Sequence, residues 1–193
     1  MGTLTGKWSE MESEEKILDA LRSGNKRDRD QAENSIYESF QPRVRAILSR
    51  VVGTGADLDD AVQEAFIDVF RGLPKFQGRS GIGTWIYRIA LRRGWKWSAR
   101  QQATRKQQVE NPGPIENTSD PDAASDIHTR EMARRFEAAI QELDYKHRSV
   151  IALSGLEGLT PNEIAKTLGI PVGTVHSRLS RARATLKSIL NVD

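Results

Sequence analysis

Cysteine is absent from the 193 residues of this chain. Its absence excludes disulfide bonds, thiolate metal sites and cysteine nucleophiles together, and it agrees with a reducing compartment such as the cytoplasm. Histidine is scarce as well: His128, His147 and His176 are scattered, without the spacing of metal ligands. We therefore expect a cytoplasmic protein that binds no metal.

Long apolar runs are also missing. No run approaches the roughly 20 residues that span a bilayer, and the N-terminal residues lack the apolar core of a signal peptide. Strand signals are absent, because β-branched residues do not alternate with polar ones in bounded runs. Helical spacing of apolar residues occurs along most of the chain. The sequence thus predicts an all-α protein that is not inserted directly into a membrane.

The net charge is only +3, but the charges are segregated. Seven basic and no acidic residues lie between Arg88 and Val109, whereas five acidic and no basic residues lie between Glu110 and Asp126. Such segregation indicates a polyanionic partner. The acidic segment also contains three prolines and no apolar periodicity, as is typical of a flexible linker. We predict two small helical domains, residues 1–106 and 127–193, joined by an acidic linker over residues 107–126.

The C-terminal segment carries the pattern of a helix-turn-helix. Thr160 and Glu163 can form a capping box at the start of the first helix. Gly169 can end that helix in the left-handed conformation, and Val175 falls where the second helix must pack back on the first. The pattern by itself predicts a DNA-binding module and nothing more specific.

The second helix of this motif has two distinct faces on a helical wheel. One face is apolar and contains Val175, Leu179, Ala182, Leu186, Ile189 and Leu190. The rest combines small, hydrogen-bonding and basic side chains, which suit base-edge and phosphate contacts in the major groove. The candidate DNA-binding residues are His176, Ser177, Arg178, Ser180, Arg181, Arg183 and Lys187. The alternative is a solvated, arginine-rich surface helix, which the capping box and the turn spacing disfavour.

An acidic amphipathic helix is predicted in the N-terminal domain, in the stretch ADLDDAVQEAFIDVF. Asp60, Gln63 and Glu64, at positions i, i+3 and i+4, share its exposed face. Three explanations compete: acidic capping of the helix N-terminus, metal-binding carboxylates, and a docking face for a partner helix. Metal binding is the least favoured, because neither a histidine nor a second acidic cluster lies nearby in the sequence.

A basic and aromatic segment follows, GRSGIGTWIYRIALRRGWKWSARQQATRK. Aromatic rings beside a basic stripe suit single-stranded nucleic acid, because stacking contributes about 1–3 kcal/mol per base while the cations bind phosphates. The candidate strand-binding residues are Arg88, Arg92, Arg93, Trp95, Lys96 and Trp97. Trp85 belongs instead to an apolar face, and we expect it in the core.

Three stretches in this order, DDAVQEAF, TWIYRIA and GLTPNEIAKTLGIPVGTVHSRLSRARATL, resemble bacterial RNA polymerase sigma factors of the extracytoplasmic-function type, within the sigma-70 family. The resemblance covers nearly the whole chain, from about Glu14 to Leu190. It implies a promoter-specificity subunit that initiates transcription at chosen promoters and has no catalytic residue or cofactor of its own. Residues 1–106 correspond to the region 2 domain and residues 127–193 to the region 4 helix-turn-helix domain.

The same resemblance implies the partners. Asp60, Gln63 and Glu64 match the face that docks on the clamp coiled coil of core polymerase. The basic and aromatic segment matches the part that opens and holds the −10 DNA strand, and the helix from about Pro171 matches the reader of the −35 duplex. Contacts with the polymerase flap and with an inhibitory anti-sigma factor are also implied.

Two positions depart from the family pattern. Arg92 stands where the family often has asparagine, and His176 stands where it often has arginine or lysine, so both departures bear on base readout. A stand-alone helix-turn-helix transcriptional regulator is the alternative function, because its C-terminal half would look similar. Such a regulator would need neither the acidic helix nor the strand-binding segment. A metal-dependent hydrolase built on the acidic helix is a third, weaker hypothesis.

Overall fold

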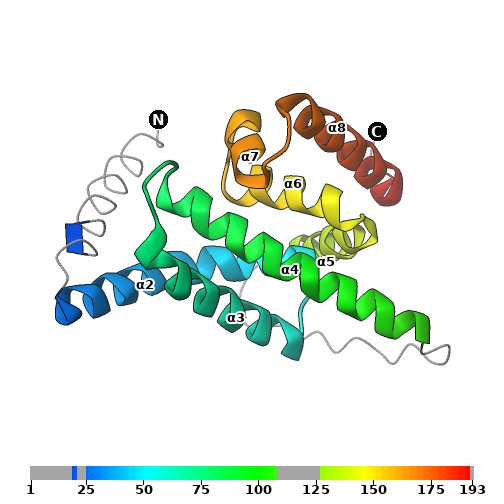
Figure 1. The fold of residues 1–193 in the computed structure, drawn as a ribbon. Coiled ribbons are helices and arrows are strands. Elements are labelled where there is room, and N and C mark those ends of the chain that lie inside the picture. Colours follow the sequence, from blue (N-terminus) through cyan, green and yellow to red (C-terminus); the bar gives the residue numbers. More distant parts are fainter. Residues whose placement is uncertain (1–18, 21–24, 108–126, 192–193) are drawn as a thin grey trace.

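The computed structural model describes residues 19–20, 25–107 and 127–191. Apart from connecting turns, the chain in these ranges is helical and contains no strand, which confirms the predicted all-α class (Figure 1). The helices are α2 (Lys26–Val52), α3 (Ala56–Gly72), the short 3-10 helix η1 (Leu73–Lys75), α4 (Ile82–Gln107), α5 (Ile127–Glu142), α6 (Tyr145–Leu156), α7 (Pro161–Leu168) and α8 (Val172–Leu190). Residues 108–126, nearly all of the predicted acidic linker, lie outside the described ranges.

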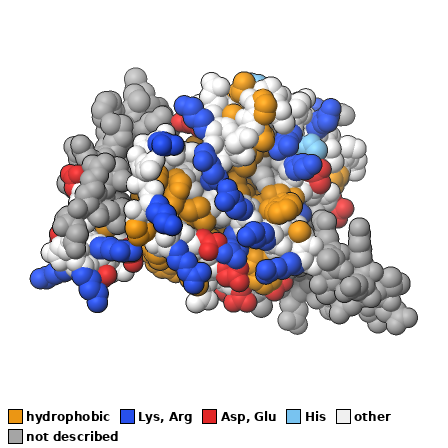
Figure 2. Space-filling model, in the orientation of Figure 1, with side chains coloured by type: hydrophobic (Ala, Val, Ile, Leu, Met, Phe, Trp, Pro, Cys, Tyr) orange, Lys and Arg blue, Asp and Glu red, His pale blue; other side chains and the backbone are white. Residues whose placement is uncertain are grey.

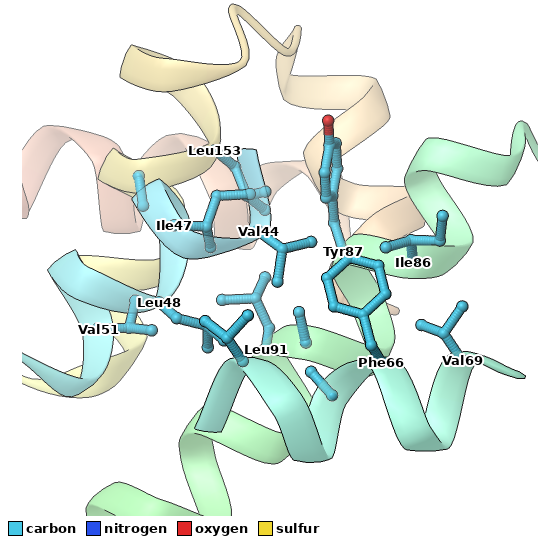
Figure 3. Close-up of a cluster of buried hydrophobic side chains, with 14 of the residues drawn as sticks. Val44, Ile47, Leu48, Val51, Phe66, Val69, Ile86, Tyr87, Leu91 and Leu153 are labelled. Carbon is cyan, nitrogen blue, oxygen red and sulfur yellow. The ribbon is translucent and has the colours of Figure 1, made fainter. Parts of the chain in front are cut away.

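Helices α2, α3 and α4 form the first helical group. Their apolar faces meet in a core in which Ile47 and Leu48 of α2, Phe66 of α3 and Ile86 and Leu91 of α4 are buried (Figure 3). Burying side chains of this size stabilises the fold by about 1.5–3 kcal/mol each. Trp85, predicted in this core, is only half-buried, because it lies at the edge of the bundle and packs on Phe76, with 5.0 Å between the ring centroids.

Helices α5 to α8 form the second group and contain the predicted helix-turn-helix. The capping box at Thr160 and Glu163 is present, and Gly169 ends α7 in the left-handed conformation with φ 66°. Four predicted positions of the apolar stripe on α8 are buried, namely Val175, Leu179, Ala182 and Leu186. Ile189 is 39% exposed, because it lies on the last turn of α8 and on the outer side of that turn.

The two helical groups pack directly against each other. The largest cluster of buried apolar side chains continues from α2, α3 and α4 into Val150 and Leu153 of α6, Ile164 of α7 and Val175 of α8. Figure 3 shows Leu153 beside Val44 and Ile47 of α2. In Figure 1, α6 and α7 accordingly lie over α4. The sequence predicts the two groups but not this shared core.

Gly94 lies in the middle of α4, where glycine normally costs about 1 kcal/mol relative to alanine. A Cβ atom at this position would lie 2.9 Å from Cδ2 of Leu48, 3.3 Å from Cγ2 of Val51 and 3.4 Å from the hydroxyl of Tyr145. The first two residues belong to α2 and the third to α6. Glycine is therefore required here by the close approach of both neighbours to the backbone of α4.

We expect Gly94→Ala to lower the free energy of unfolding by about 1–3 kcal/mol, because overpacking at a buried contact outweighs the gain in helix propensity. Gly155→Ala is the matched control. Gly155 is exposed near the end of α6 with no atom within 4 Å of an added Cβ, so alanine should be neutral or stabilising there. Urea unfolding of both variants checks this, and a Gly94→Ala variant as stable as Gly155→Ala would contradict the packing argument.

Candidate nucleic-acid and partner-binding surfaces

The acidic face predicted from the sequence lies on α3. Asp60 and Gln63 are exposed, whereas Glu64 is half-buried. The opposite side of α3 is buried, as its amphipathic pattern predicts. Ile67, one turn after Gln63, is 40% exposed and adds an apolar side chain that our sequence analysis did not include. The sequence did contain a signal for Ile67, which is an apolar residue that lies outside the buried stripe on a helical wheel of α3. We call Asp60, Gln63, Glu64 and Ile67 the acidic face.

Arg93 of α4 reaches across to α3. Its Nη1 donates to Oε2 of Glu64 at 3.0 Å, and its Nε donates to Oδ2 of Asp68 at 3.0 Å. The guanidinium is mostly buried, with 19% of its side chain exposed. The hydrogen bond to Asp68 raises the pKa of Arg93 above its usual value, so the cation persists at any physiological pH. Arg93 therefore joins α4 to α3 and holds Glu64 at the edge of the acidic face.

Three of the predicted strand-binding residues form an exposed face on α4. Arg92, Trp95 and Lys96 are exposed and follow one another at helical spacing, and 54% of Trp95 is accessible. We call these three residues the basic–aromatic face. Figure 2 shows Lys and Arg side chains in a diagonal row over the region where α4 lies in Figure 1, with hydrophobic atoms beside them. A ring and two cations on one surface suit stacking and phosphate contacts.

The other predicted strand-binding residues of α4 are engaged within the protein, two by hydrogen bonds and one by packing. Arg93 is bonded to α3 as described, and Arg88 donates to the backbone carbonyls of Lys166 and Thr167 in α7. Trp97 is half-buried and packs against the main core, and its indole Nε1 is buried without a hydrogen-bond partner among the described residues. These three side chains thus contribute to packing in this arrangement, and their predicted contacts with DNA stay predictions.

The candidate DNA-reading side chains of α8 project outward. Six of the seven are exposed, namely His176, Ser177, Ser180, Arg181, Arg183 and Lys187, whereas Arg178 is half-buried. His176, Ser180 and Arg183, at positions i, i+4 and i+7, also line a shallow hollow beside Ser154 of α6 and Pro161 of α7. The structure therefore presents one surface with hydroxyl, imidazole and guanidinium groups, a set that can contact base edges and phosphates.

The described part of the chain offers neither a metal-binding cluster nor a membrane-spanning helix. Within ranges 19–20, 25–107 and 127–191 no group of three or more histidine, aspartate or glutamate side chains could hold a metal ion. In the same part of the chain no helix combines the length and the apolar character of a membrane span.

Comparison with known protein families identifies two matches in this chain. The Sigma-70 region 2 family matches residues 36–104, which include the acidic face and most of α4. The Sigma-70, region 4 family matches residues 133–186, which include α6, α7 and most of α8. The two matches fall on the two helical groups of the structure, in the order in which the sequence resemblance places them.

Similar proteins align over nearly the full chain. The ECF RNA polymerase sigma-E factor of Escherichia coli K12 is 31% identical over 187 residues, which cover 92% of this chain and 94% of that protein. The sigma-E factor of Haemophilus influenzae Rd is 29% identical, with 93% and 96% covered. Two solved structures share the fold: CnrH in complex with the cytosolic domain of CnrY, and the Bartonella quintana sigma factor RpoE in complex with the anti-sigma factor NepR.

The CnrH structure has a TM-score of 0.66 at 24% identity and covers 94% of this chain and 99% of that chain. The RpoE structure has a TM-score of 0.67 at 22% identity and covers 83% of this chain and 97% of that chain. At these identities the likeness to both structures establishes a common fold and no more.

We expect Arg93→Ala to destabilise the protein by about 1 kcal/mol, because it removes a guanidinium shared by two carboxylates. The neighbouring Arg92→Ala removes the same charge from an exposed position and should change stability by less than about 0.5 kcal/mol. Chemical denaturation of the two variants measures the difference. Equal stability of the two variants would mean that the Arg93 ion pairs contribute nothing to the packing of α4 on α3.

Proposed function

The chain belongs to the extracytoplasmic-function (ECF) type of bacterial RNA polymerase sigma factors, and we propose that three separate surfaces on it divide promoter recognition. The acidic face docks on core polymerase, the basic–aromatic face binds the unwound −10 strand, and α8 reads the −35 duplex. One observation carries the proposal: the region 2 and region 4 matches occur in a single chain, each over the helices that hold the corresponding surface.

The acidic face suits a rigid helical partner such as the clamp coiled coil of core polymerase. Asp60 and Gln63 offer a charge and an amide in a position where both are exposed. Ile67 adds apolar area beside them, and apolar side chains surrounded by polar ones are typical of protein interfaces. Glu64 reaches the same surface but is held by Arg93. We therefore expect Asp60, Gln63 and Ile67 to make the main direct contacts with core polymerase.

The basic–aromatic face of α4 suits a single strand. Trp95 supplies a ring on which an unpaired base can stack, while Arg92 and Lys96 lie within one turn of it and bind phosphates. Arg88, Arg93 and Trp97 remain members of the predicted −10 set, since each belongs to the same helix. In this proposal Arg93 acts through α3 as a positioning residue, and Arg88 contacts DNA only after it leaves α7.

The outward face of α8 suits the major groove of the −35 duplex. Arg181 and Arg183 bind guanine edges or phosphates, and Ser177 and Ser180 leave room for close approach. His176 can donate or accept a hydrogen bond according to its protonation. Arg178, which is half-buried, contributes from the flank.

In this proposal the protein itself catalyses no reaction. Formation of phosphodiester bonds belongs to core polymerase, so the chain requires neither a metal nor another cofactor, and it acts with polymerase in the cytoplasm. The flap of core polymerase is a second docking site, for the region 4 helices. An anti-sigma factor is a further partner, because a similar structure contains one.

Transcription in vitro with sigma-free core polymerase on a pool of genomic fragments tests the function. We expect a stable complex with core and initiation at discrete start sites that share −10 and −35 sequences. A stand-alone helix-turn-helix regulator would instead bind duplex DNA strongly without polymerase and give no such starts. The region 2 match over residues 36–104 disfavours that alternative.

We expect the double variant Asp60→Ala, Gln63→Ala to weaken binding to core polymerase by at least tenfold while leaving the fold intact, since both side chains are exposed. Asp30→Ala, an exposed acid on α2, is the control for the lost charge. Titration of fluorescently labelled protein with core measures the affinity. Unchanged affinity in the double variant would remove the acidic face from the docking site.

We expect Arg181→Ala to reduce transcription from the target promoter, with a loss of about 1–3 kcal/mol in binding if the guanidinium contacts a base. A phosphate contact would instead weaken binding evenly across sequences and reduce the salt slope by about one. Arg71→Ala, an exposed arginine at the end of α3, removes the same charge away from α8. A footprint and transcript yield equal to those of Arg71→Ala would exclude Arg181 from −35 recognition.

A further inference from the structure

A shallow hollow lies where α8 packs against α6 and α7. The described residues that line it come from all three helices: Ser154, Pro161, His176, Leu179, Ser180 and Arg183. Their polar groups are two hydroxyls, one imidazole and one guanidinium, and none of these lining residues is acidic. Because an arginine is always charged, the hollow carries at least one positive charge.

These groups suit an oxyanion such as a phosphate. Guanidinium and protonated imidazole groups donate charge-assisted hydrogen bonds to anionic oxygens, and hydroxyls donate to the same oxygens. The start of α7 adds partial positive charge, and Pro161 is its first residue. Since the polar side chains belong to α6 and α8, the preference for an anion does not depend on the end of α7 alone.

A DNA backbone passes close to this position in helix-turn-helix complexes. The first helix of the motif crosses the backbone, while the N-terminal residues of the second helix enter the major groove. The hollow lies between these two elements, beside Pro161 at the start of α7 and His176 near the start of α8. In the proposed function, a backbone phosphate of the −35 duplex is therefore the oxyanion that comes nearest to it.

The side chains of α8 that line the hollow form a row distinct from the one that points away from the core. Successive residues are turned by about 100° around a helix, so Ser177 and Arg181 lie on the row next to His176 and Ser180. The row of Ser177 and Arg181 is exposed, opposite the buried stripe of α8. We expect it to face the base edges, and the row of His176 to face the backbone.

His176 differs from the other cations of α8 because its charge depends on pH. Arginine and lysine stay charged, whereas an imidazole gains or loses its proton roughly between pH 5 and 8. Among the described lining residues, Arg183 is the other ionisable group. From the helices packed against α8, α6 contributes Ser154 and α7 contributes Pro161, and α5 contributes no lining residue.

Carboxylates close to the lining residues in the sequence are bonded elsewhere. Glu163, two residues after Pro161, accepts from the backbone N–H and the hydroxyl of Thr160 at 2.9 and 2.8 Å. Glu157, three residues after Ser154, accepts from the hydroxyl of Tyr87. A phosphate that enters the hollow is therefore the anion that pairs with a protonated imidazole there.

We propose that this hollow seats one backbone phosphate of the −35 duplex and that His176 holds the phosphate only when protonated, so that promoter binding takes up one proton. The inference rests on the proposed function. It adds Ser154, which lies outside the helix-turn-helix, as a phosphate contact. Because the phosphate stabilises the protonated imidazole, affinity rises as the pH falls and is lost as the pH rises, by at most about tenfold per pH unit for one proton.

The test uses holoenzyme, assembled from core polymerase and the full chain, and a fluorescent promoter fragment taken from the mapped start sites. Affinity is measured over a range of salt at about pH 6 and about pH 8, on either side of the imidazole transition. His176→Lys keeps its cation at both values, so affinities expressed relative to this variant exclude the pH dependence of polymerase itself. His176→Gln is neutral at both values.

Two controls match the substitutions in the hollow. His147→Gln replaces a histidine of α6 that does not line the hollow, and Ser39→Ala removes an exposed hydroxyl from α2. We expect Ser154→Ala to bind the fragment about threefold more weakly at the lower pH, as the loss of one hydrogen bond predicts. Ser39→Ala should bind as the wild type does, and equal affinities of the two serine variants would remove α6 from the phosphate site.

Relative to His176→Lys, the wild type and His147→Gln should bind about three- to tenfold more tightly at the lower pH, with a salt slope steeper by about one. His176→Gln should lose both effects. A wild-type affinity that does not change with pH relative to His176→Lys, or a pH dependence without a change in salt slope, would overturn the inference alone. Failure of every holoenzyme to bind the fragment at either pH would overturn the proposed function, and the inference with it.

Discussion

Helix α4 has to satisfy three neighbours and still present a binding surface. Gly94 lets α2 and Tyr145 approach its backbone, Arg93 attaches it to two carboxylates of α3, and Tyr87 and Arg88 attach it to the second helical group. Among the side chains of α4 that the structure describes, those of Arg92, Trp95 and Lys96 lie on a side that is exposed to solvent. The positions of the other two binding surfaces depend on this helix, because α3 carries the acidic face and α7 leads into the turn that orients α8.

Local features were predictable from the sequence. The capping box, the left-handed Gly169 and the buried stripe on α8 depend on residues within a few positions of one another, and all three are present in the structure. The amphipathic character of α3 is confirmed for the same reason. The all-α class followed from apolar spacing alone.

Long-range pairings were not predictable. Arg88, Arg92 and Arg93 look equivalent in the sequence, yet Arg93 bonds to Asp68, 25 residues away, and Arg88 bonds to Thr167, 79 residues away. Trp97 was grouped with Trp95 for a similar reason, but it faces the core. Composition and periodicity report which side of a helix is apolar. They do not report which exposed-looking cation will find a carboxylate or a carbonyl after folding, because that depends on helices that are distant in the sequence.

The amide of Gln141 supplies an external cap to the last turn of α2. A fragment that ends after α4 would lose that cap and would expose apolar side chains of α2 that Val150 and Leu153 cover in the intact chain. Measurements on such an N-terminal fragment would then report the fraying of α2 together with the properties of the promoter-binding surface. The intact chain is the natural unit for biophysical work on either half.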